Sequence, residues 1–542
     1  MSANSDKLSD PSVSKQKSDC NQLRTDLLDA LVMTIKSEGL PFMRGIEKEG
    51  LRATAKHEIS QADHPKALGH PLTHPTITTD YSEALTELIT PVKKTREELL
   101  QSLTEIHQQV ASHIGDETLW PGSMPCLIDG ENSIRIAEYG DSNIGKLKHV
   151  YRQGLGVRYG RIMQSIAGLH FNFSFSDGFW QNLQNTMNAN DLSLQDFKSQ
   201  QYFALIRNFR RYSWLLMYLF GASPSLDKSF INGKPHNLDL FDDKGSYYKP
   251  YATSLRMGDL GYHNNAQSSL AICFNSLPNF ITTLDQAIHT PYPKYKDIGL
   301  KKNDEYIQIN SNILQIENEY YSAIRPKRTT QKTETPRHAL NERGVEYVEV
   351  RCLDLNPFLP LGISAKQVDF LDTFLTYCLL SNSPLISDED CIRLDDNFEK
   401  VVNRGREPNL ELNGPCGTIS LEKWALTLID EMAKVATILD ESTIDARYRL
   451  ALEEQKSKII HSELCPSAQV LSIMKEESLS WIDFASELAF KHKSCLLKDF
   501  PNQAAVLQEI SSSAEKSFLD EQSIKTSDKI SFDAFLKQYQ VE

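Results

Sequence analysis

Two glutamates stand two residues apart in the segment Phe42–Ala53, FMRGIEKEGLRA. If this segment is a β-strand, Glu47 and Glu49 point to the same face, because side chains alternate along a strand with a period of two. Neighbouring carboxylates repel each other unless a cation or water separates them. The pair therefore fits either a metal site or an exposed edge strand, and this segment alone favours the edge strand.

A second acidic group lies in residues 78–91, TTDYSEALTELITP. The segment predicts a helix that is capped by its first Thr or Asp and ended by Pro91. Asp80, Glu83 and Glu87 would then share one helical face, because their spacing is i, i+3 and i+7. A solvated acidic stripe is the ordinary interpretation of such a face, and a set of metal ligands is the alternative.

The clearest strand pattern in the chain covers residues 166–177, IAGLHFNFSFSD. One face of this predicted strand is almost wholly apolar and consists of Leu169, Phe171, Phe173 and Phe175. An apolar face of this kind is expected in a core. The opposite face, which carries His170, then lines either water or a site, and a single histidine there is more often structural than a ligand.

Residues 344–354, GVEYVEVRCLD, predict a further strand on which Glu349 and Arg351 share one face. The two side chains either pair with each other or serve a metal ion and a phosphate respectively, because arginine suits bidentate phosphate contacts. Each of the four segments has an ordinary structural explanation. Together they present carboxylates, one imidazole and one guanidinium, a set that suits Mg²⁺ or Mn²⁺ better than zinc.

Three more clusters mix tyrosine with arginine or lysine, in residues 151–161, 253–262 and 316–328. We expect the first two in glycine-containing turns, and such surfaces can hold a carboxylate or a polyphosphate. The sequence contains no Walker P-loop and no kinase-type glycine-rich loop with its partner motifs. If ATP binds, it is therefore expected to bind through metal ions and arginines.

The composition narrows the possible partners. The chain has 542 residues with 58 Lys+Arg against 72 Asp+Glu, for a formal net charge of −14. This acidity opposes binding to nucleic acid or to an anionic membrane. The most apolar long stretch, residues 202–220, contains three arginines and predicts a buried amphipathic helix and no membrane span.

The number and spacing of the cysteines indicate the cellular compartment of the protein. Nine of them are scattered along the chain without a C-x-x-C pair, and no apolar leader is present at the N-terminus. This pattern predicts a reducing compartment, the cytoplasm, and no zinc ribbon. Cys391 and Cys416 flank a turn-rich stretch, so a disulfide between them is an alternative to reduced thiols.

The predicted strand and helix patterns divide the chain into an α+β part and a helical part. We expect a disordered tail over residues 1–20, a catalytic core over 21–404 and a helical part over 405–542, which is packed on the core and possibly continuous with it. Long helical patterns dominate from Ser420 onward, and residues 405–417 are the turn-rich connection.

Eight motifs now resemble one family in order and register: GIEKEGLR, TTDYSEALTELITP, LWPGSMPC, YRQGLGVRYGR, MQSIAGLHFNFS, TSLRMGDLGY, LQIENEYYSAIRPKR and GVEYVEVRCLDLNPF. They resemble glutamate–cysteine ligase (γ-glutamylcysteine synthetase) of the gammaproteobacterial type. The resemblance implies an α+β fold related to glutamine synthetase, in which a curved antiparallel sheet, flanked by helices, forms a funnel-shaped active site. It also implies the joining of glutamate to cysteine with ATP, the first step of glutathione synthesis.

The resemblance assigns roles to particular residues. The implied metal ligands are Glu47, Glu49, Asp80, Glu87, His170 and Glu349. The arginines implied beside the transferred phosphoryl group are Arg256 and Arg351. The implied cysteine-substrate pocket consists of Tyr81, Tyr151, Leu155, Gln164, Tyr262 and Tyr321. Glu83 matches no ligand of the family, and Tyr81 departs from the phenylalanine often found at its position.

The implied chemistry is phosphorylation of the glutamate γ-carboxylate by ATP with Mg²⁺ or Mn²⁺, followed by attack of the cysteine amine. Feedback inhibition by glutathione is a further implication of the resemblance, and a monomer is the expected state. Three rivals remain at this point. They are a ligase for another amine, a two-metal phosphoesterase or nuclease, and a metal-dependent binding module.

Overall fold

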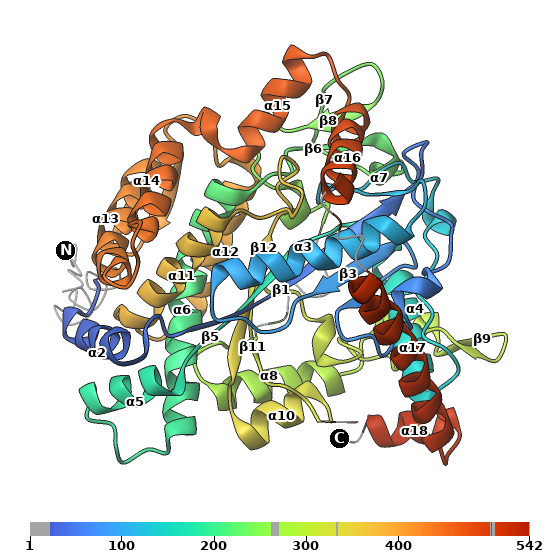
Figure 1. Cartoon of the computed structure of the whole chain (residues 1–542), viewed down its shortest axis with the longest axis horizontal. Coiled ribbons are helices and arrows are strands. Elements are labelled where there is room, and N and C mark those ends of the chain that lie inside the picture. Colours follow the sequence, from blue (N-terminus) through green and yellow to red (C-terminus); the bar gives the residue numbers. More distant parts are fainter. Residues whose placement is uncertain are drawn as a thin grey trace, which may run out of the picture.

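The computed structural model describes residues 22–261, 270, 272–331, 334–498, 500 and 504–540. A seven-stranded antiparallel sheet lies at the centre of the molecule, with helices on both sides of it (Figure 1). Its strands follow the order β11-β12-β5-β1-β3-β2, and β4 pairs with β1 outside this path. Their bounds are β1 (Phe42–Ala53), β2 (Ile77–Thr79), β3 (Leu85–Ile89), β4 (Thr118–Leu119), β5 (Leu169–Phe175), β11 (Ile324–Lys327) and β12 (Tyr347–Leu353).

Helices make up most of the remaining described chain. In the first part they are α2 (Leu28–Glu38), α3 (Arg96–His113), α4 (Asn143–Tyr159), α5 (Asp177–Thr186), α6 (Leu194–Phe220), α7 (Lys228–Ile231), α8 (Leu277–His289), α9 (Pro293–Ile298), α10 (Pro336–Arg343), α11 (Ala365–Leu380) and α12 (Asp388–Arg404). From Leu421 onward they are α13 (Leu421–Asp440), α14 (Arg447–Ile460), α15 (Pro466–Glu476), α16 (Trp481–Lys498), α17 (Ala504–Ser527) and α18 (Phe532–Tyr539). The predicted α+β fold with a helical C-terminal part is confirmed.

Three small sheets complete the described fold. They are β6 (Ser225–Asp227), β7 (Asp239–Leu240) and β8 (Ser246–Tyr248) in one sheet, β9 (Lys301–Lys302) with β10 (Glu305–Tyr306), and β13 (Glu411–Gly414) with β14 (Gly417–Ser420). The β13–β14 hairpin lies in and just after the segment that the sequence predicts to be turn-rich. Cys391 lies on α12 and Cys416 lies in the turn between β13 and β14, and both carry free thiols, so the alternative of a disulfide between them is wrong.

Three predicted strands are present and carry the sheet. The 42–53 segment forms β1, the 166–177 segment contains β5, and the 344–354 segment contains β12. Phe171 and Phe173 on β5 are fully buried, as their alternation with polar residues predicts. The predicted buried helix over residues 202–220 is also present, as the C-terminal two-thirds of α6, which packs against β11 and β12.

The prediction of a helix over residues 78–91 is wrong. The segment forms β2 and β3, joined by a turn in which the N–H of Asp80 donates to the carbonyl of Leu85. Glu87 therefore lies on a strand, directly opposite Glu49 of β1, and shares no helical face with Asp80. Pairing with β1 outweighs the local helical pattern, because strand preference depends on the neighbours a strand finds in the sheet.

The glycine-containing turn predicted for residues 151–161 is also wrong, because α4 continues through it to Tyr159. Its glycines serve close packing within the helix. A Cβ on Gly154 would lie 2.0 Å from Oε1 of Gln315, and a Cβ on Gly156 would lie 2.5 Å from the Tyr81 hydroxyl. Two neighbouring segments thus approach α4 more closely than any larger residue allows.

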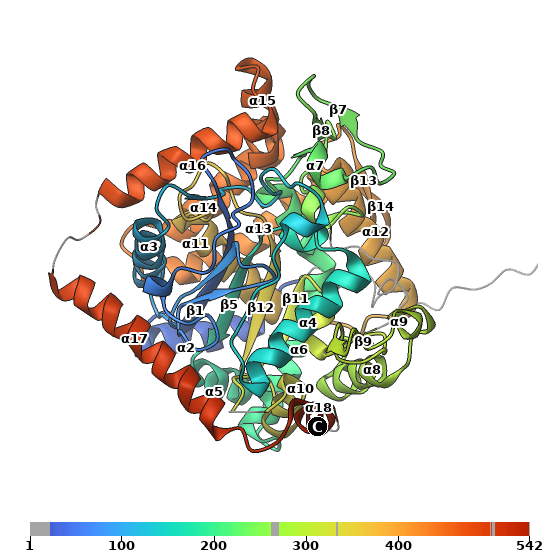
Figure 2. The same ribbon diagram turned by 90° about the vertical axis from the view of Figure 1, so that its right-hand side faces the viewer.

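The C-terminal helices extend along the outside of the molecule. In Figure 2, α17 runs along one edge and leads to α18, which contacts α4. The docking of α17 uses Ser517, whose hydroxyl accepts the backbone N–H of His70 at 2.8 Å. In the part of the chain that the structure describes, no helix combines the length and the apolar character needed to cross a membrane.

Candidate functional site

The register of the sheet gathers the predicted ligands. Glu47 of β1 stands directly opposite His170 of β5, and Glu349 of β12 stands opposite Asn172, the next residue on that face of β5. The Nδ1 atom of His170 lies 3.4 Å from Glu47 Oε2 and 3.9 Å from Glu349 Oε1. One ligand atom from each of the three residues lies within 4.8 Å of the others, which is a spacing that a single cation can bridge.

The other nitrogen of the imidazole faces a second group of carboxylates. His170 Nε2 lies 3.7 Å from Glu49 Oε1. The second oxygen of Glu49 accepts the backbone N–H of Gly168 at 2.6 Å, and Glu87 faces Glu49 across the β1–β3 ladder. Asp80, in the turn between β2 and β3, is close enough that burial and its charge together raise the pKa of both Glu49 and Glu87.

The electrostatics of this second group favour a cation. Burial, followed by the charge of Asp80, raises the pKa of Glu49 to about 7. Burial, followed by the charge of Glu47, raises the pKa of Glu87 well above its usual value. No lysine or arginine within the described ranges forms an ion pair with Glu87. Oxygen-rich donors with one imidazole and uncompensated negative charge fit a divalent ion such as Mg²⁺ or Mn²⁺.

Two cationic side chains hold the carboxylate of Glu349. Arg351 Nη1 lies 2.9 Å from Glu349 Oε2, and Lys327 Nζ lies 3.2 Å from Glu349 Oε1. Burial opposes ionisation of Glu349, but Lys327 and Arg351 hold its pKa well below the usual value. Glu349 therefore pairs with Arg351, as one of the two interpretations left open by the sequence predicts, and its Oε1 also faces the imidazole of His170.

Arg256 lies at the end of the same sheet and is almost fully buried. Its Nε donates to Asp354 Oδ1 at 2.8 Å, and its Nη2 donates to the carbonyl of Leu353 at 2.8 Å. A Cβ on Gly168 would lie 2.8 Å from Nη1 of Arg256. Gly168 therefore touches both this guanidinium and the Glu49 carboxylate, and it links the two parts of the site.

The residues expected in the cysteine pocket lie on and around α4. Gln164 donates from Nε2 to the Tyr321 hydroxyl at 3.1 Å. Tyr151 and Leu155 lie one turn apart on α4, and Tyr81 packs its hydroxyl against Gly156 of the same helix. Tyr262 lies outside the described residues.

Glu83 has a structural role. Its carboxylate accepts the backbone N–H of His64 at 2.9 Å and that of Glu138 at 2.7 Å, and the side chain is buried. These contacts fix two loops to the β2–β3 turn. This structural role agrees with the sequence analysis, in which Glu83 matches no predicted metal ligand.

Three polar residues of the site are not among the site residues predicted from the sequence, although two of them belong to the polar cluster over residues 316–328. Arg325 and Lys327 lie two residues apart on β11, and Arg325 is directly opposite Glu349 on β12. On β5, the side-chain amide of Asn172 donates to Glu47 Oε1 at 2.8 Å. The alternation of Arg325, Pro326 and Lys327 within residues 316–328 was a usable signal for a strand. The sequence alone did not say which residue of β12 that strand would face.

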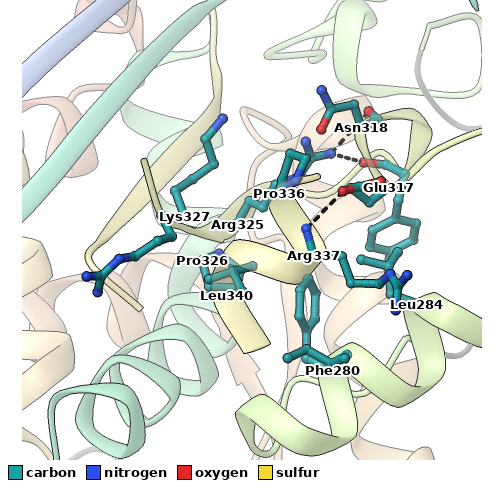
Figure 3. A pocket seen from close by; sticks show the side chains of 13 residues that line it. Phe280, Leu284, Glu317, Asn318, Arg325, Pro326, Lys327, Pro336, Arg337 and Leu340 are labelled. Atoms are coloured by element: carbon teal, nitrogen blue, oxygen red, sulfur yellow. Dashed lines mark hydrogen bonds between the residues drawn. The ribbon is translucent and has the colours of Figure 1, made fainter. Parts of the chain in front are cut away.

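A pocket lies beside β11, between α8 and α10 (Figure 3). Phe280, Leu284 and Leu340 form its apolar floor, and the carboxylate of Glu317 accepts the backbone N–H of Arg337 at 2.9 Å along one side. Lys327 belongs to the rim of this pocket and extends away from the apolar floor. The pocket and the carboxylate cluster are therefore neighbours that share Lys327.

The chain is similar to known proteins over most of its length. Residues 34–401 match the family model described as glutamate-cysteine ligase. The chain is 53% identical over 503 residues to a glutamate–cysteine ligase of Hahella chejuensis, covering 92% of this chain and 95% of that protein. It is similar to the crystal structure of the Francisella tularensis glutamate–cysteine ligase in complex with AMP, with a TM-score of 0.86, 36% identity, and coverage of 93% of this chain and 98% of that one.

A more distant structure shares the fold alone. The bifunctional glutathione synthetase of Pasteurella multocida matches with a TM-score of 0.69 at 22% identity, over 94% of this chain and 60% of that one. The family model and the Hahella relative both extend over most of the described sheet and its carboxylates. This chain belongs to the glutamate–cysteine ligase family.

Proposed function

We propose that this chain joins the γ-carboxylate of L-glutamate to the amine of L-cysteine, with conversion of ATP to ADP and phosphate, in the first step of glutathione synthesis. The observation that carries the proposal is the convergence of Glu47, His170 and Glu349 beside the guanidinium of Arg351. The nucleotide assignment is supported by the AMP in the crystal structure of the Francisella tularensis relative.

The metal requirement follows from the chemistry of the donors. Glu47, His170 and Glu349 would hold one Mg²⁺ or Mn²⁺ ion, and Glu49, Asp80 and Glu87 would supply further oxygen ligands. Such an ion, when bound, would supply positive charge that offsets the negative charge building up during phosphoryl transfer. The raised pKa values of Glu49 and Glu87 support this assignment, because a nearby cation relieves the repulsion that burial intensifies.

The residues of the chain then have separate tasks. A carboxylate is a poor electrophile, so glutamate is first converted to an acyl phosphate, and Arg351 and Arg256 would stabilise the migrating phosphoryl oxygens. Asp354 holds the Arg256 guanidinium in place for this task. Tyr81, Tyr151, Leu155, Gln164, Tyr262 and Tyr321 would position cysteine so that its neutral amine attacks the acyl carbon and releases phosphate. Exclusion of water from the site would protect the acyl phosphate from hydrolysis.

The proposal also covers the cellular location, the oligomeric state and the inhibition of the enzyme. The odd number and scattered positions of the cysteines support a cytoplasmic location. We also infer a monomer that is feedback-inhibited by glutathione, as the family resemblance implies.

One assay tests the proposal against its rivals. Purified chain is supplied with ATP, Mg²⁺ and glutamate, and ADP release is followed with a panel of amines. Cysteine-dependent ADP release with a γ-glutamyl dipeptide as product is expected. ADP release that needs no amine, or that needs a different amine, would overturn the proposal.

A further inference from the structure

The Lys327 ammonium holds the same carboxylate oxygen that faces the candidate metal site. Its Nζ lies 3.2 Å from Oε1 of Glu349. That oxygen is also the one nearest to His170, at 3.9 Å from Nδ1, whereas Oε2 of Glu349 is taken by Arg351 at 2.9 Å. The oxygen that would bind a metal ion therefore already binds a cationic side chain.

A metal ion and this ammonium compete for Glu349. The ligand atoms of Glu47, His170 and Glu349 lie within 4.8 Å of one another, so an ion placed among them comes close to any charge on Oε1. Repulsion between two cations is strong at such a distance in a largely buried site, because little water screens it. Lys327 must therefore move away from Oε1 when the ion binds.

The side chain of Lys327 is suited to such a movement. It is 26% exposed, and its four-carbon stem is flexible. It is one of the residues that line the neighbouring pocket, and its stem extends away from the apolar floor (Figure 3). Arg325 differs, because its guanidinium is fixed by the backbone carbonyls of Asn318 and Tyr320.

The charges around Glu349 indicate what Lys327 would bind after the movement. Arg325 stands opposite Glu349 on β11, and Lys327 and Arg351 both pair with its carboxylate. Once a metal ion takes the charge of Glu349, these three cations are left with less negative charge than before. A polyphosphate would restore the balance, since it offers several anionic oxygens within reach of a mobile ammonium.

We propose that Lys327 occupies the cation site in the metal-free enzyme, leaves Glu349 when the metal ion enters, and then binds the phosphate chain of the nucleotide. This inference rests on the proposed function, because it takes the carboxylate cluster as a metal site. It makes Lys327 a residue that couples metal binding to nucleotide binding.

The first test measures the affinity of the nucleotide-free protein for Mn²⁺ by electron paramagnetic resonance. Lys327→Met removes the charge at nearly constant length, and it should raise Mn²⁺ affinity about tenfold or more, because a competing cation is lost. Lys327→Arg keeps the charge and should stay near wild type. Lys302→Met, on exposed β9, is the matched control and should have no effect. Unchanged or weaker Mn²⁺ binding in Lys327→Met would overturn the proposal.

The second test measures the affinity for ATP at saturating Mg²⁺ by isothermal titration calorimetry. Lys327→Met should weaken ATP binding about tenfold or more, because a charge-assisted phosphate contact is lost. Opposite changes in the two affinities identify the exchange, since general damage to the site would weaken both. Unchanged ATP affinity would overturn the phosphate contact.

Synthesis of γ-glutamylcysteine by the wild-type protein is measured in parallel. If wild type makes the dipeptide and Lys327→Met leaves Mn²⁺ affinity unchanged, the exchange fails and the proposed function stands. If wild type makes no dipeptide and the two affinities still change in opposite directions, the proposed function fails and the exchange stands.

Discussion

The imidazole of His170 and the carboxylate of Glu47 lie 3.4 Å apart, from Nδ1 to Oε2, although 123 residues separate them in the sequence. They meet because β1 and β5 are antiparallel neighbours in a register that places the two residues directly opposite each other. The other ring nitrogen faces Glu49 at 3.7 Å. One histidine thus stands between the carboxylates of both halves of the candidate metal site.

Glu349→Gln should lower γ-glutamylcysteine synthesis by about 100-fold or more, because a bound metal ion contributes several kcal/mol to transition-state stabilisation. The rate is measured at saturating substrates, and circular dichroism reports whether the variant is folded. Glu346→Gln is the control, since Glu346 is an exposed residue three positions earlier in the chain. Normal turnover in a folded Glu349→Gln protein would remove this residue from the ligand set.

Gly168→Ala should lower kcat by about 10- to 100-fold, because small misplacements of catalytic groups have effects of this size. The added Cβ would lie 2.8 Å from Nη1 of Arg256, and Asp354 and the Leu353 carbonyl leave that guanidinium little room to retreat. Gly50→Ala is the matched control, since its Cβ meets no atom closer than 3.7 Å. A Gly168→Ala enzyme with wild-type kcat would show that the position of Arg256 is not critical.

Tyr81→Phe should increase the free energy of unfolding by about 1 kcal/mol, because a buried polar group without a hydrogen bond is destabilising. The Tyr81 hydroxyl is buried and has no hydrogen-bond partner among the described residues, and burial raises its pKa. The measurement is urea-induced unfolding of the two proteins. A large loss of stability in Tyr81→Phe would mean that the hydroxyl has a partner.

A double-mutant cycle checks the same contact. Gly156→Ala should destabilise the wild type, because its Cβ would lie 2.5 Å from the Tyr81 hydroxyl. In the Tyr81→Phe background that atom is absent, so the same substitution should be tolerated. Equal effects in the two backgrounds would show that Tyr81 and Gly156 are not coupled.

The stability of the protein should fall as the pH decreases from about 6.5 toward 4, in part through His64. Burial, with the charge of nearby Arg52, lowers the pKa of His64 to about 4, and neither ring nitrogen has a described partner. In this pH range the unfolded chain binds a proton that the folded protein does not, so folding becomes less favourable at low pH. Between pH 7.5 and pH 5 the contribution of His64 is about 2 kcal/mol, at about 1.4 kcal/mol per pKa unit.

The measurement is urea-induced unfolding at the two pH values in wild type and in His64→Leu. The variant should lose less stability on acidification than wild type. His461→Leu is the control, since His461 is exposed at the end of α14. An identical pH dependence in wild type and His64→Leu would contradict the assignment.

The local patterns predicted what depends on near neighbours in the chain. The alternation around Glu47, His170 and Glu349 predicted β1, β5 and β12, because strand periodicity depends on which side of each segment is buried. Local patterns did not predict the structure where a partner far away in the chain decides it. Residues 78–91 have a helical pattern, yet they form β2 and β3 because β1 offers them a hydrogen-bonded edge. Gly154 and Gly156 suggested a turn, yet they make room within α4 for Gln315 and Tyr81.

By itself, then, the sequence determined the residue types of the site, the three strands that carry four of its predicted ligands and, through eight ordered motifs, the family. Only the tertiary structure decided which of those residues meet. Glu47 faces His170, Glu87 faces Glu49, and Lys327 reaches the Glu349 oxygen that points to the imidazole. The physical reason is that strand register and side-chain competition arise between segments far apart in the chain, where no local spacing encodes the pairing.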